Sequence, residues 1–289
     1  MCRLALLGIL ACLPSLLAAD TPTKGKAIAF VAPATKLPPT VKRLGDKGDK
    51  EGLDYLVYLP ADYDQDKAKF WPLVVFLHGS GERGADVQLV RKTGLTQTLE
   101  QRGATPYVMI APQCPLGSGW NTGALDKLLD QTLTDYRIDK KRVILTGLSM
   151  GGYGTWKWGA EHPERFAALI PVCGGGKPET ATSLKGMPIW GFHGDADTAV
   201  KLTAGQAMID AAKQAGAVAK FTIYPGVGHQ SWGKAYTEPE LESWILAKKN
   251  KSRAWTWAWA EQVSPLSLGD SGLRDERPPL PQPIVTVQD

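Results

Sequence analysis

The sequence predicts an α/β protein in which a mainly parallel sheet carries helices on both faces. Seven short apolar runs have the composition of buried parallel strands, and five longer segments between them have helical character. Strands that alternate with helices favour parallel pairing, because each helix carries the chain back across the sheet. A third observation is the sequence Gly-Leu-Ser-Met-Gly at 147–151, which joins one strand to the helix after it. The length of 289 residues suits one large domain or two small ones, and only one sheet's worth of strands is visible.

The expected strands are runs in which apolar side chains follow one another without a polar face. Such runs are typical of strands that are buried on both sides. Strands are therefore expected at 55–59, 73–78, 107–111, 143–146, 167–172, 188–193 and 220–224. Helices are expected at 86–101, 124–136, 151–161, 204–215 and 239–249. In a sheet of this kind the chemistry collects at the carboxyl ends of the strands.

Ser149 lies where the strand expected at 143–146 gives way to the helix expected at 151–161. A serine on a sharp strand-to-helix turn adopts strained backbone angles, and glycines two positions to either side, Gly147 and Gly151, make room for it. The turn holds the hydroxyl clear of the sheet, and the helix N-terminus behind it favours developing negative charge. Ser149 is therefore the candidate nucleophile.

The partners of a serine nucleophile follow it along the chain. Serine needs an imidazole to take its proton, and the imidazole needs a carboxylate to orient it. An acid after the next-to-last expected strand and His229 after the last complete the order serine, acid, histidine. Two acids compete for that role; we assign it to Asp197, four positions after His193, and regard Asp195 as a turn residue. His193 itself is expected to be a structural group at the strand end.

The loop after the second expected strand is rich in glycine, with the sequence Gly-Ser-Gly-Glu-Arg-Gly at 79–84. Such a loop lets backbone N–H groups turn toward a developing oxyanion. We expect the two donors to be the N–H of Met150, which follows the nucleophile, and the N–H of Ser80. Glu82 and Arg83 are expected to form ion pairs that hold the loop, with a substrate contact by Arg83 as the alternative. A nucleotide site is not favoured, because the loop lacks a third spaced glycine and a Lys-Ser/Thr ending.

Several short motifs occur together in this chain. They are Leu-His-Gly-Ser-Gly-Glu-Arg-Gly at 77–84, Ala-Pro-Gln-Cys-Pro at 111–115, the serine turn preceded by Asp-Lys-Lys-Arg at 139–142, Glu-His-Pro-Glu-Arg-Phe-Ala-Ala at 161–168, and His-Gln-Ser-Trp at 229–232. In this combination the sequence resembles the bacterial carboxylesterases of the α/β-hydrolase superfamily that are often described as predicted peptidases or phospholipase/carboxylesterases. It is similar, more distantly, to dienelactone hydrolases and to feruloyl and polyhydroxybutyrate esterases. The similarity runs from about residue 52 to 247, and no motif departs from the pattern.

The resemblance implies an α/β-hydrolase fold whose catalytic triad is Ser149, Asp197 and His229. It also implies that Trp120 and Trp232 lie near the substrate pocket and contribute to substrate binding, with core packing as the alternative for each. Only a short loop separates residues 173 and 187, where lidded hydrolases insert a helical cap, so little or no cap domain is expected. An open pocket suits an ester displayed on a bulky carrier, such as an acetyl or feruloyl group on polysaccharide.

The two ends of the chain differ in composition from its middle. Residues 1–19 have a positive start and an apolar stretch, which predicts a signal peptide and a secreted or periplasmic protein; the stretch is short for a membrane span. A lipid anchor at Cys12 is the alternative to simple cleavage. Residues 20–51 form a basic N-terminal segment and residues 52–250 the catalytic domain. Residues 251–289 are a tail that contains three tryptophans and then proline-rich sequence, and they are expected to be largely disordered.

The composition argues against several other partners. A net charge of +4 is modest, and the N-terminal lysines are interleaved with acids and prolines, so no nucleic-acid surface is expected. The four histidines are scattered and no Cys-x-x-Cys occurs, so neither a metal nor a cofactor is expected. Cys114 and Cys173 each follow an expected strand, which leaves a disulfide and a pair of buried thiols as alternatives. We expect a monomer.

The sequence as a whole predicts a secreted serine carboxylesterase that works through an acyl-enzyme on small-molecule or polysaccharide-linked esters. A serine peptidase related to prolyl peptidases is the alternative among enzymes, although no propeller domain or paired-glutamate motif is evident. A non-catalytic binding protein on the same scaffold is the alternative outside enzymes.

Overall fold

The structure, a computed structural model, describes residues 37–45 and 52–250. The expected signal peptide, Cys12, most of the 20–51 segment and the tail therefore lie outside the described residues. The strands are β1 (Thr40–Arg43), β2 (Asp54–Tyr58), β3 (Trp71–Leu77), β4 (Val108–Pro112), β5 (Ile138–Leu148), β6 (Ala168–Val172), β7 (Pro188–Gly194) and β8 (Val218–Tyr224). The α-helices are α1 (Gly94–Arg102), α2 (Thr122–Asp135), α3 (Met150–Glu161), α4 (Leu202–Gln214), α5 (Trp232–Ala235) and α6 (Leu241–Leu246).

The strands form one sheet in the order β1-β2-β4-β3-β5-β6-β7-β8. Pairing is parallel from β4 across to β8, and antiparallel only where β1 and β2 join at one edge. The chain runs from β3 outward to β4 and then returns to β5 on the other side of β3. At such a switch the loops that leave two neighbouring strands diverge and open a crevice at their carboxyl ends. The predicted α/β-hydrolase fold is confirmed.

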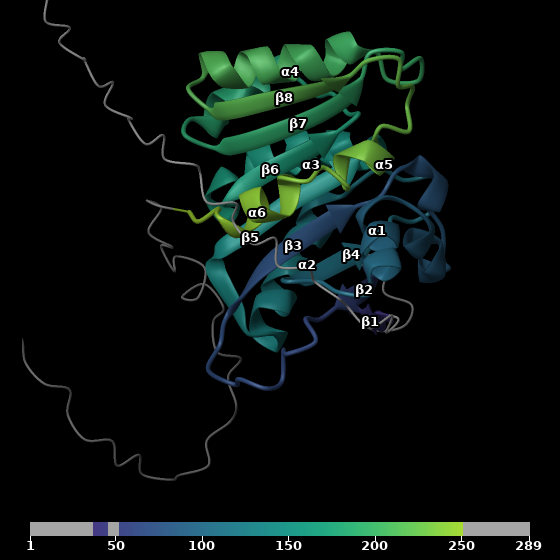
Figure 1. Ribbon diagram of the computed structural model, residues 1–289, viewed down its shortest axis with the longest axis vertical. Helices are drawn as coiled ribbons and strands as arrows, with labels where there is room; N and C mark the ends of the chain where they lie inside the picture. The colour runs from purple at the N-terminus through teal and green to yellow at the C-terminus, as the bar shows by residue number, and fades with distance from the viewer. Residues whose placement is uncertain (1–36, 46–51, 251–289) are drawn as a thin grey trace, which may run out of the picture.

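Helices cover both faces of this sheet, as predicted (Figure 1). Successive strand residues point to opposite faces, so Val75 belongs to one apolar core and Val74 to the other. The first core contains the buried side chains of α2, α3 and α4, and the second contains those of α1, α5 and α6. Figure 1 shows α5 and α6 crossing in front of the central strands. Burial on both faces explains why the central strands appear in the sequence as uninterrupted apolar runs.

Four elements differ from the sequence expectation, and one of them is the short helix α5, which was not expected. The edge strand β1 was not expected, because all four of its side chains are exposed and it shows no apolar pattern. The helix expected at 86–101 is divided into a 3₁₀ helix at Val87–Lys92 and the helix α1. The break occurs where Gly94 adopts a φ of +63° against Phe76, a contact that leaves no space for a side chain. The last expected helix, at 239–249, is shorter, because α6 covers only Leu241–Leu246.

A short 3₁₀ helix, Pro178–Leu184, is the element between β6 and β7, the place where a cap would be inserted. The expectation of little or no cap agrees with this connection. Among the described residues, none of the helices has the length and apolar composition needed to cross a membrane.

Candidate active site

The turn between β5 and α3 places Ser149 above the end of the sheet. Ser149 has φ +53° and ψ −116°, a conformation that costs a side-chain-bearing residue on the order of 1–3 kcal/mol. A Cβ added to Gly151 would lie 1.9 Å from the carbonyl oxygen of Leu77, and one added to Gly147 would lie 2.4 Å from the carbonyl oxygen of Gly151. Neither position can carry a side chain, so the predicted steric role of the two glycines is confirmed.

The loops after β7 and β8 bring two further predicted residues to Ser149. The Ser149 Oγ lies 2.9 Å from Nε2 of His229, and Nδ1 of His229 lies 2.8 Å from Oδ2 of Asp197. His229 is therefore hydrogen-bonded on both ring nitrogens in a continuous line from hydroxyl to carboxylate. The three residues are up to 80 positions apart in sequence, and the parallel order β5-β6-β7-β8 brings them to one edge of the sheet.

The carboxylate of Asp197 is held from several sides. Its Oδ1 accepts hydrogen bonds from the amides of Ala199 and Val200, each at 2.9 Å, and its side chain is fully buried. Burial raises the pKa of this carboxyl, but the hydrogen bonds from His229 and from the two amides outweigh that effect and leave the pKa below its ordinary value. Asp195 instead accepts a 2.7 Å hydrogen bond from the amide of Gly226, which joins the turns after β7 and β8. The structure thus places Asp197 against the histidine and Asp195 in a turn.

The two amides expected to bind an oxyanion begin neighbouring helical turns. Met150 is the first residue of α3, and Ser80 is the first residue of the 3₁₀ turn Ser80–Glu82. The first N–H groups of a helix have no acceptor within it, so both amides are available to a ligand. The loops lie close together, since a Cβ added to Gly79 would be 3.6 Å from the Cβ of Ser149.

His78 at the end of β3 orients the Ser80 amide. The amide of Cys114 donates to Nε2 of His78 at 2.9 Å, so the ring proton lies on Nδ1, which donates to the carbonyl of Gly79 at 2.6 Å. Burial lowers the pKa of His78 to about 4, which keeps the ring neutral. The carbonyl and the N–H of a trans peptide point in opposite directions. Holding the Gly79 carbonyl toward His78 therefore directs the Ser80 N–H away from it. The sequence reasoning did not single out His78.

The ion pairs expected for Glu82 and Arg83 do not form with any charged partner in the part of the chain that the structure describes, so that expectation is wrong. Arg83 donates to two backbone carbonyls instead, that of Ser80 at 3.0 Å and that of Ser118 at 3.2 Å. The Glu82 carboxylate turns toward His78, which is neutral, and burial raises the pKa of that carboxyl. The Arg83 side chain thus joins this loop to the loop after β4. These hydrogen bonds to carbonyls hold the loop at 79–84 in place, which is the role expected for the ion pairs.

Gln113 at the end of β4 completes this support. Its amide nitrogen donates to the carbonyls of Glu82 and Asp86, each at 2.8 Å, and the residue is 3% exposed. Gln113 belongs to the Ala-Pro-Gln-Cys-Pro motif, so its presence in that motif was the one signal available. The sequence contains no rule that connects residue 113 to a loop thirty positions earlier.

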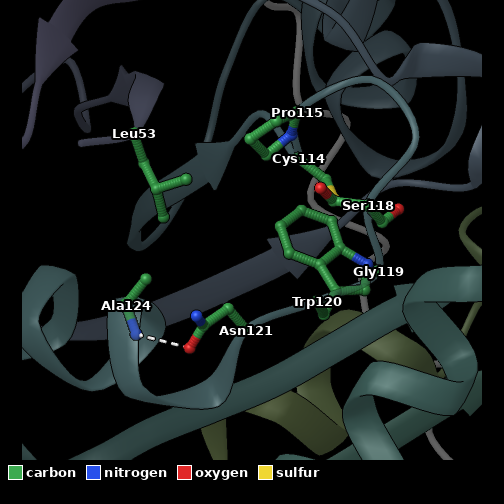
Figure 2. A pocket seen from close by; sticks show the side chains of 8 residues that line it. All are labelled: Leu53, Cys114, Pro115, Ser118, Gly119, Trp120, Asn121 and Ala124. Atoms are coloured by element: carbon green, nitrogen blue, oxygen red, sulfur yellow. Dashed lines mark hydrogen bonds between the residues drawn. The ribbon is translucent and has the colours of Figure 1, made fainter. Parts of the chain in front are cut away.

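The two predicted tryptophans occupy different places. The Trp232 ring stands perpendicular to the His229 ring, with 5.5 Å between their centres. Trp120 packs edge-on against His78 at 4.8 Å and lines a cavity of about 110 Å³, which Figure 2 shows from close by. The other residues lining this cavity are Leu53, Cys114, Pro115, Ser118, Gly119, Asn121 and Ala124. Trp232 thus contacts the histidine of the site, while Trp120 lies beside the loop that carries Ser80.

Both cysteines among the described residues are buried and unbonded. Cys114 follows β4 and Cys173 follows β6, and the sheet places β3 and β5 between these strands. Three strand spacings of about 4.8 Å separate them, far more than a disulfide spans. Burial raises the pKa of Cys173 to about 12 and also raises that of Cys114, so neither thiol is poised to ionise. Of the two alternatives, the structure shows buried thiols.

No cluster of three His, Cys, Asp or Glu side chains suited to a metal ion occurs among residues 37–45 and 52–250. The motif at 161–168 forms a different kind of cluster, with residues of α2 and α3. There Asp126 accepts hydrogen bonds from Trp158 at 2.9 Å and from Arg165 at 2.8 Å, and His162 lies 3.1 Å from its second oxygen. These contacts join two helices, so this motif contributes to packing.

The sheet order and the serine turn together define an α/β-hydrolase. A profile of the dienelactone hydrolase family matches residues 120–265, about half of the chain. The chain therefore belongs to the dienelactone hydrolase family, and it is a hydrolase.

Several relatives and solved structures are similar to this chain. Carboxylesterase SOBER1 of Arabidopsis thaliana is 31% identical over 125 residues, which are 41% of this chain and 53% of that protein. A probable feruloyl esterase C of Aspergillus terreus is 26% identical over 43% of this chain and 47% of its own length. A thermostable esterase structure has a TM-score of 0.63 at 32% identity, over 73% of this chain and 63% of that one. A ferulic acid esterase structure has a TM-score of 0.56 at 19% identity, over 72% and 99%, and shows the shared fold.

The chain spans about half the length of these two curated relatives. The bifunctional acetylxylan esterase/xylanase XynS20E of Neocallimastix patriciarum is 28% identical over 153 residues, which are 50% of this chain and 22% of that protein.

Proposed function

We propose that this protein is a serine carboxylesterase in which Ser149, His229 and Asp197 act as a catalytic triad. The observation that carries the proposal is the hydrogen-bonded line from the Ser149 hydroxyl through His229 to the Asp197 carboxylate. It begins at a serine that stands out of the sheet on a strained turn. A hydroxyl, an imidazole and a buried carboxylate at these distances are the groups that acyl transfer needs.

In the first half of the reaction, Nε2 of His229 takes the hydroxyl proton as Ser149 Oγ attacks the ester carbonyl carbon. Asp197 holds the Nδ1 proton of the ring and stabilises the imidazolium that forms. The imidazolium then gives its proton to the leaving alcohol oxygen as the ester C–O bond breaks, which leaves the acyl group on Ser149. In the second half, His229 activates a water molecule that attacks the acyl-enzyme and releases the carboxylic acid.

The negative charge that develops on the carbonyl oxygen is bound by the amides of Ser80 and Met150. Each such donor contributes about 10²–10³-fold to turnover in related chemistry. The amides belong to separate loops, and His78 and Arg83 hold the Ser80 loop in place. Trp232, against the His229 ring, forms a wall of the substrate site in this proposal.

The proposed substrates are short-chain acyl esters and acetyl or feruloyl esters carried on polysaccharide. Two observations support this class. The connection between β6 and β7 carries only a short 3₁₀ helix, and the relatives include proteins named as feruloyl and acetylxylan esterases. The signal-like residues 1–19 support a secreted or periplasmic location, where such substrates occur.

The test is turnover of nitrophenyl acetate and butyrate, methyl ferulate and acetylated xylan by the wild type and by Ser149→Ala. The variant removes the nucleophile and leaves the turn in place, so we expect turnover to fall about 10⁴-fold or more with an unchanged melting temperature. Ser243→Ala on α6 is the control and should behave as the wild type.

A fluorophosphonate probe should label the wild type on Ser149, and mass spectrometry would locate the adduct. A Ser149→Ala variant that keeps a tenth of the wild-type rate would contradict the assignment. Faster cleavage of aminoacyl nitroanilides than of any ester would favour the peptidase alternative.

A further inference from the structure

His193 occupies the next-to-last position of β7 and is completely buried. Its Nε2 lies 2.9 Å from the carbonyl oxygen of Val200 and 3.3 Å from Oδ2 of Asp197. A carbonyl oxygen can only accept a hydrogen bond, so Nε2 carries the proton and donates to Val200. The same N–H thus places the positive end of its dipole beside the carboxylate oxygen that binds His229.

The other ring nitrogen of His193, Nδ1, has no hydrogen-bond partner among the described residues. It faces Gly205 at the start of α4, where an added Cβ would lie only 2.7 Å away. Burying an unpaired acceptor is unfavourable, and an apolar side chain of similar size would avoid that cost. The feature that His193 supplies and an apolar side chain would not is its single N–H group.

That N–H group closes the short turn that carries the acid. Oδ1 of Asp197 accepts hydrogen bonds from the backbone amides of Ala199 and Val200. The backbone carbonyl of Val200 in turn accepts a hydrogen bond from the N–H group of His193. The strand end and the turn are therefore locked together around the carboxylate. Rotation of the carboxylate would break the two hydrogen bonds that Oδ1 accepts from backbone amides. It would also move Oδ2 away from the N–H group of His193.

We propose that His193 is a positioning residue that holds the Asp197 carboxylate in the orientation required by His229. The inference rests on the proposed function, in which Asp197 orients the general base. His193 touches neither the substrate nor Ser149 in this proposal and acts only through Asp197.

The test compares two substitutions of the same residue. His193→Met keeps a flexible side chain of similar size but has no donor, whereas the amide of His193→Gln places an N–H group near the position of Nε2. We expect His193→Met to lower kcat about 10- to 100-fold with KM within about twofold of wild type, because a small misplacement of a catalytic group has effects of that size. We expect His193→Gln to recover most of that loss.

Trp190→Phe is the matched control. Trp190 lies on the same strand, is 1% exposed and donates a partly buried 2.9 Å hydrogen bond to Thr222. Its substitution also removes one buried donor from β7, but that donor has no contact with Asp197. We expect it to lower the melting temperature and to leave kcat and the pH profile unchanged.

The pH profile supplies a readout that a packing role would not move. A donor beside an ionised carboxylate lowers its pKa, so losing the donor raises the pKa of Asp197 toward its ordinary value. The pH profile of the Asp197 carboxyl carbon in a ¹³C NMR titration should therefore shift to higher pH in His193→Met, by about half a unit or more, and should stay in place in His193→Gln.

Proton NMR separates this inference from the proposed function, because it needs no turnover. The Nδ1 proton of His229 should be protected from exchange in the wild type and in His193→Gln, and broadened or lost in His193→Met. A wild type without esterase activity that still shows this pattern would overturn the proposed function alone. Wild-type kcat and a protected His229 proton in His193→Met would overturn the positioning role, as would equal losses in the Met and Gln variants.

Discussion

The turn at Ser149 and the loop at Ser80 lie side by side over the ends of β5 and β3, but different forces hold them. The Ser149 turn is held by steric exclusion over five residues, since Gly147 and Gly151 sit against backbone atoms with no space for a Cβ. The Ser80 loop is held by side-chain hydrogen bonds, among them those of His78 and Gln113.

The difference shows how a fold builds two halves of one site. The steric half is set by glycines at fixed spacing and is visible in the sequence. The hydrogen-bonded half depends on partners about thirty positions away, which become neighbours only because β4 lies beside β3. A side-chain change is therefore expected to be tolerated at Ser80 as long as its amide is kept. The chemistry proposed at Ser149 instead depends on the side chains of Ser149, His229 and Asp197.

The largest effect after loss of the nucleophile is expected at Asp197. Asp197→Asn should lower kcat on the order of 10⁴-fold, because the amide stabilises the wrong tautomer of His229, an effect of the size known for serine proteases. Asp195→Asn keeps an acceptor for the Gly226 amide and should cost less than about tenfold. Steady-state kinetics on nitrophenyl butyrate measures both variants. A larger loss in the Asp195 variant would transfer the acid role to that residue.

A smaller effect is expected on the other side of the site. Ser80→Pro removes the proposed oxyanion donor and should lower kcat about 10²–10³-fold. The backbone permits the change, because Gly79 is extended, as the residue before proline should be, and Ser80 begins a helical turn. Ser80→Ala keeps the amide and should retain activity within a few fold. Equal losses in the two variants would show that the hydroxyl, rather than the amide, is the active group.

The smallest effect is expected from the tail, which neither half of the site is proposed to use. All residues assigned a role here lie between 78 and 232. The composition after residue 262, rich in proline, glycine and charge, predicts too little apolar burial to offset the loss of conformational entropy on ordering. Truncation after Gln262 should leave kcat unchanged and the melting temperature within about two degrees. Scanning calorimetry and ester turnover measure both. Loss of soluble, folded protein would show that the tail is structural.

Much of the fold was predictable because most of its strands, β2 to β7, are largely buried on both faces. A strand such as β7 has no polar side, so its apolar run marks it directly, and all seven expected strands are present. The strand β1 was not predicted, because all its side chains are exposed and its sequence has no apolar run. The division of the helix expected at 86–101 was not predicted either, because the break depends on the contact between Gly94 and Phe76 of β3.

The candidate site divides in the same way. The order of Ser149, Asp197 and His229, each after a parallel strand, could be predicted from the sequence because parallel strands bring their carboxyl ends to one edge. The contacts of Arg83 could not, because its partners are backbone carbonyls of Ser80 and Ser118, and every residue has a carbonyl. Charge in the sequence suggested an ion pair, and among residues 37–45 and 52–250 the structure shows none for Arg83.

The sequence by itself determined the kind of sheet, the strained turn at Ser149 and the order of its partners, because apolar periodicity and glycine spacing act over a few residues. Only the tertiary structure decided which strands are neighbours. That order placed Cys114 and Cys173 too far apart to bond, and it brought the Cys114 amide to His78, which fixes the ring that supports the Ser80 amide. The folding of the turn after β7 set His193 against Asp197. These contacts join residues that are distant along the chain or that share a tight turn, and their distances follow from packing that no local pattern records.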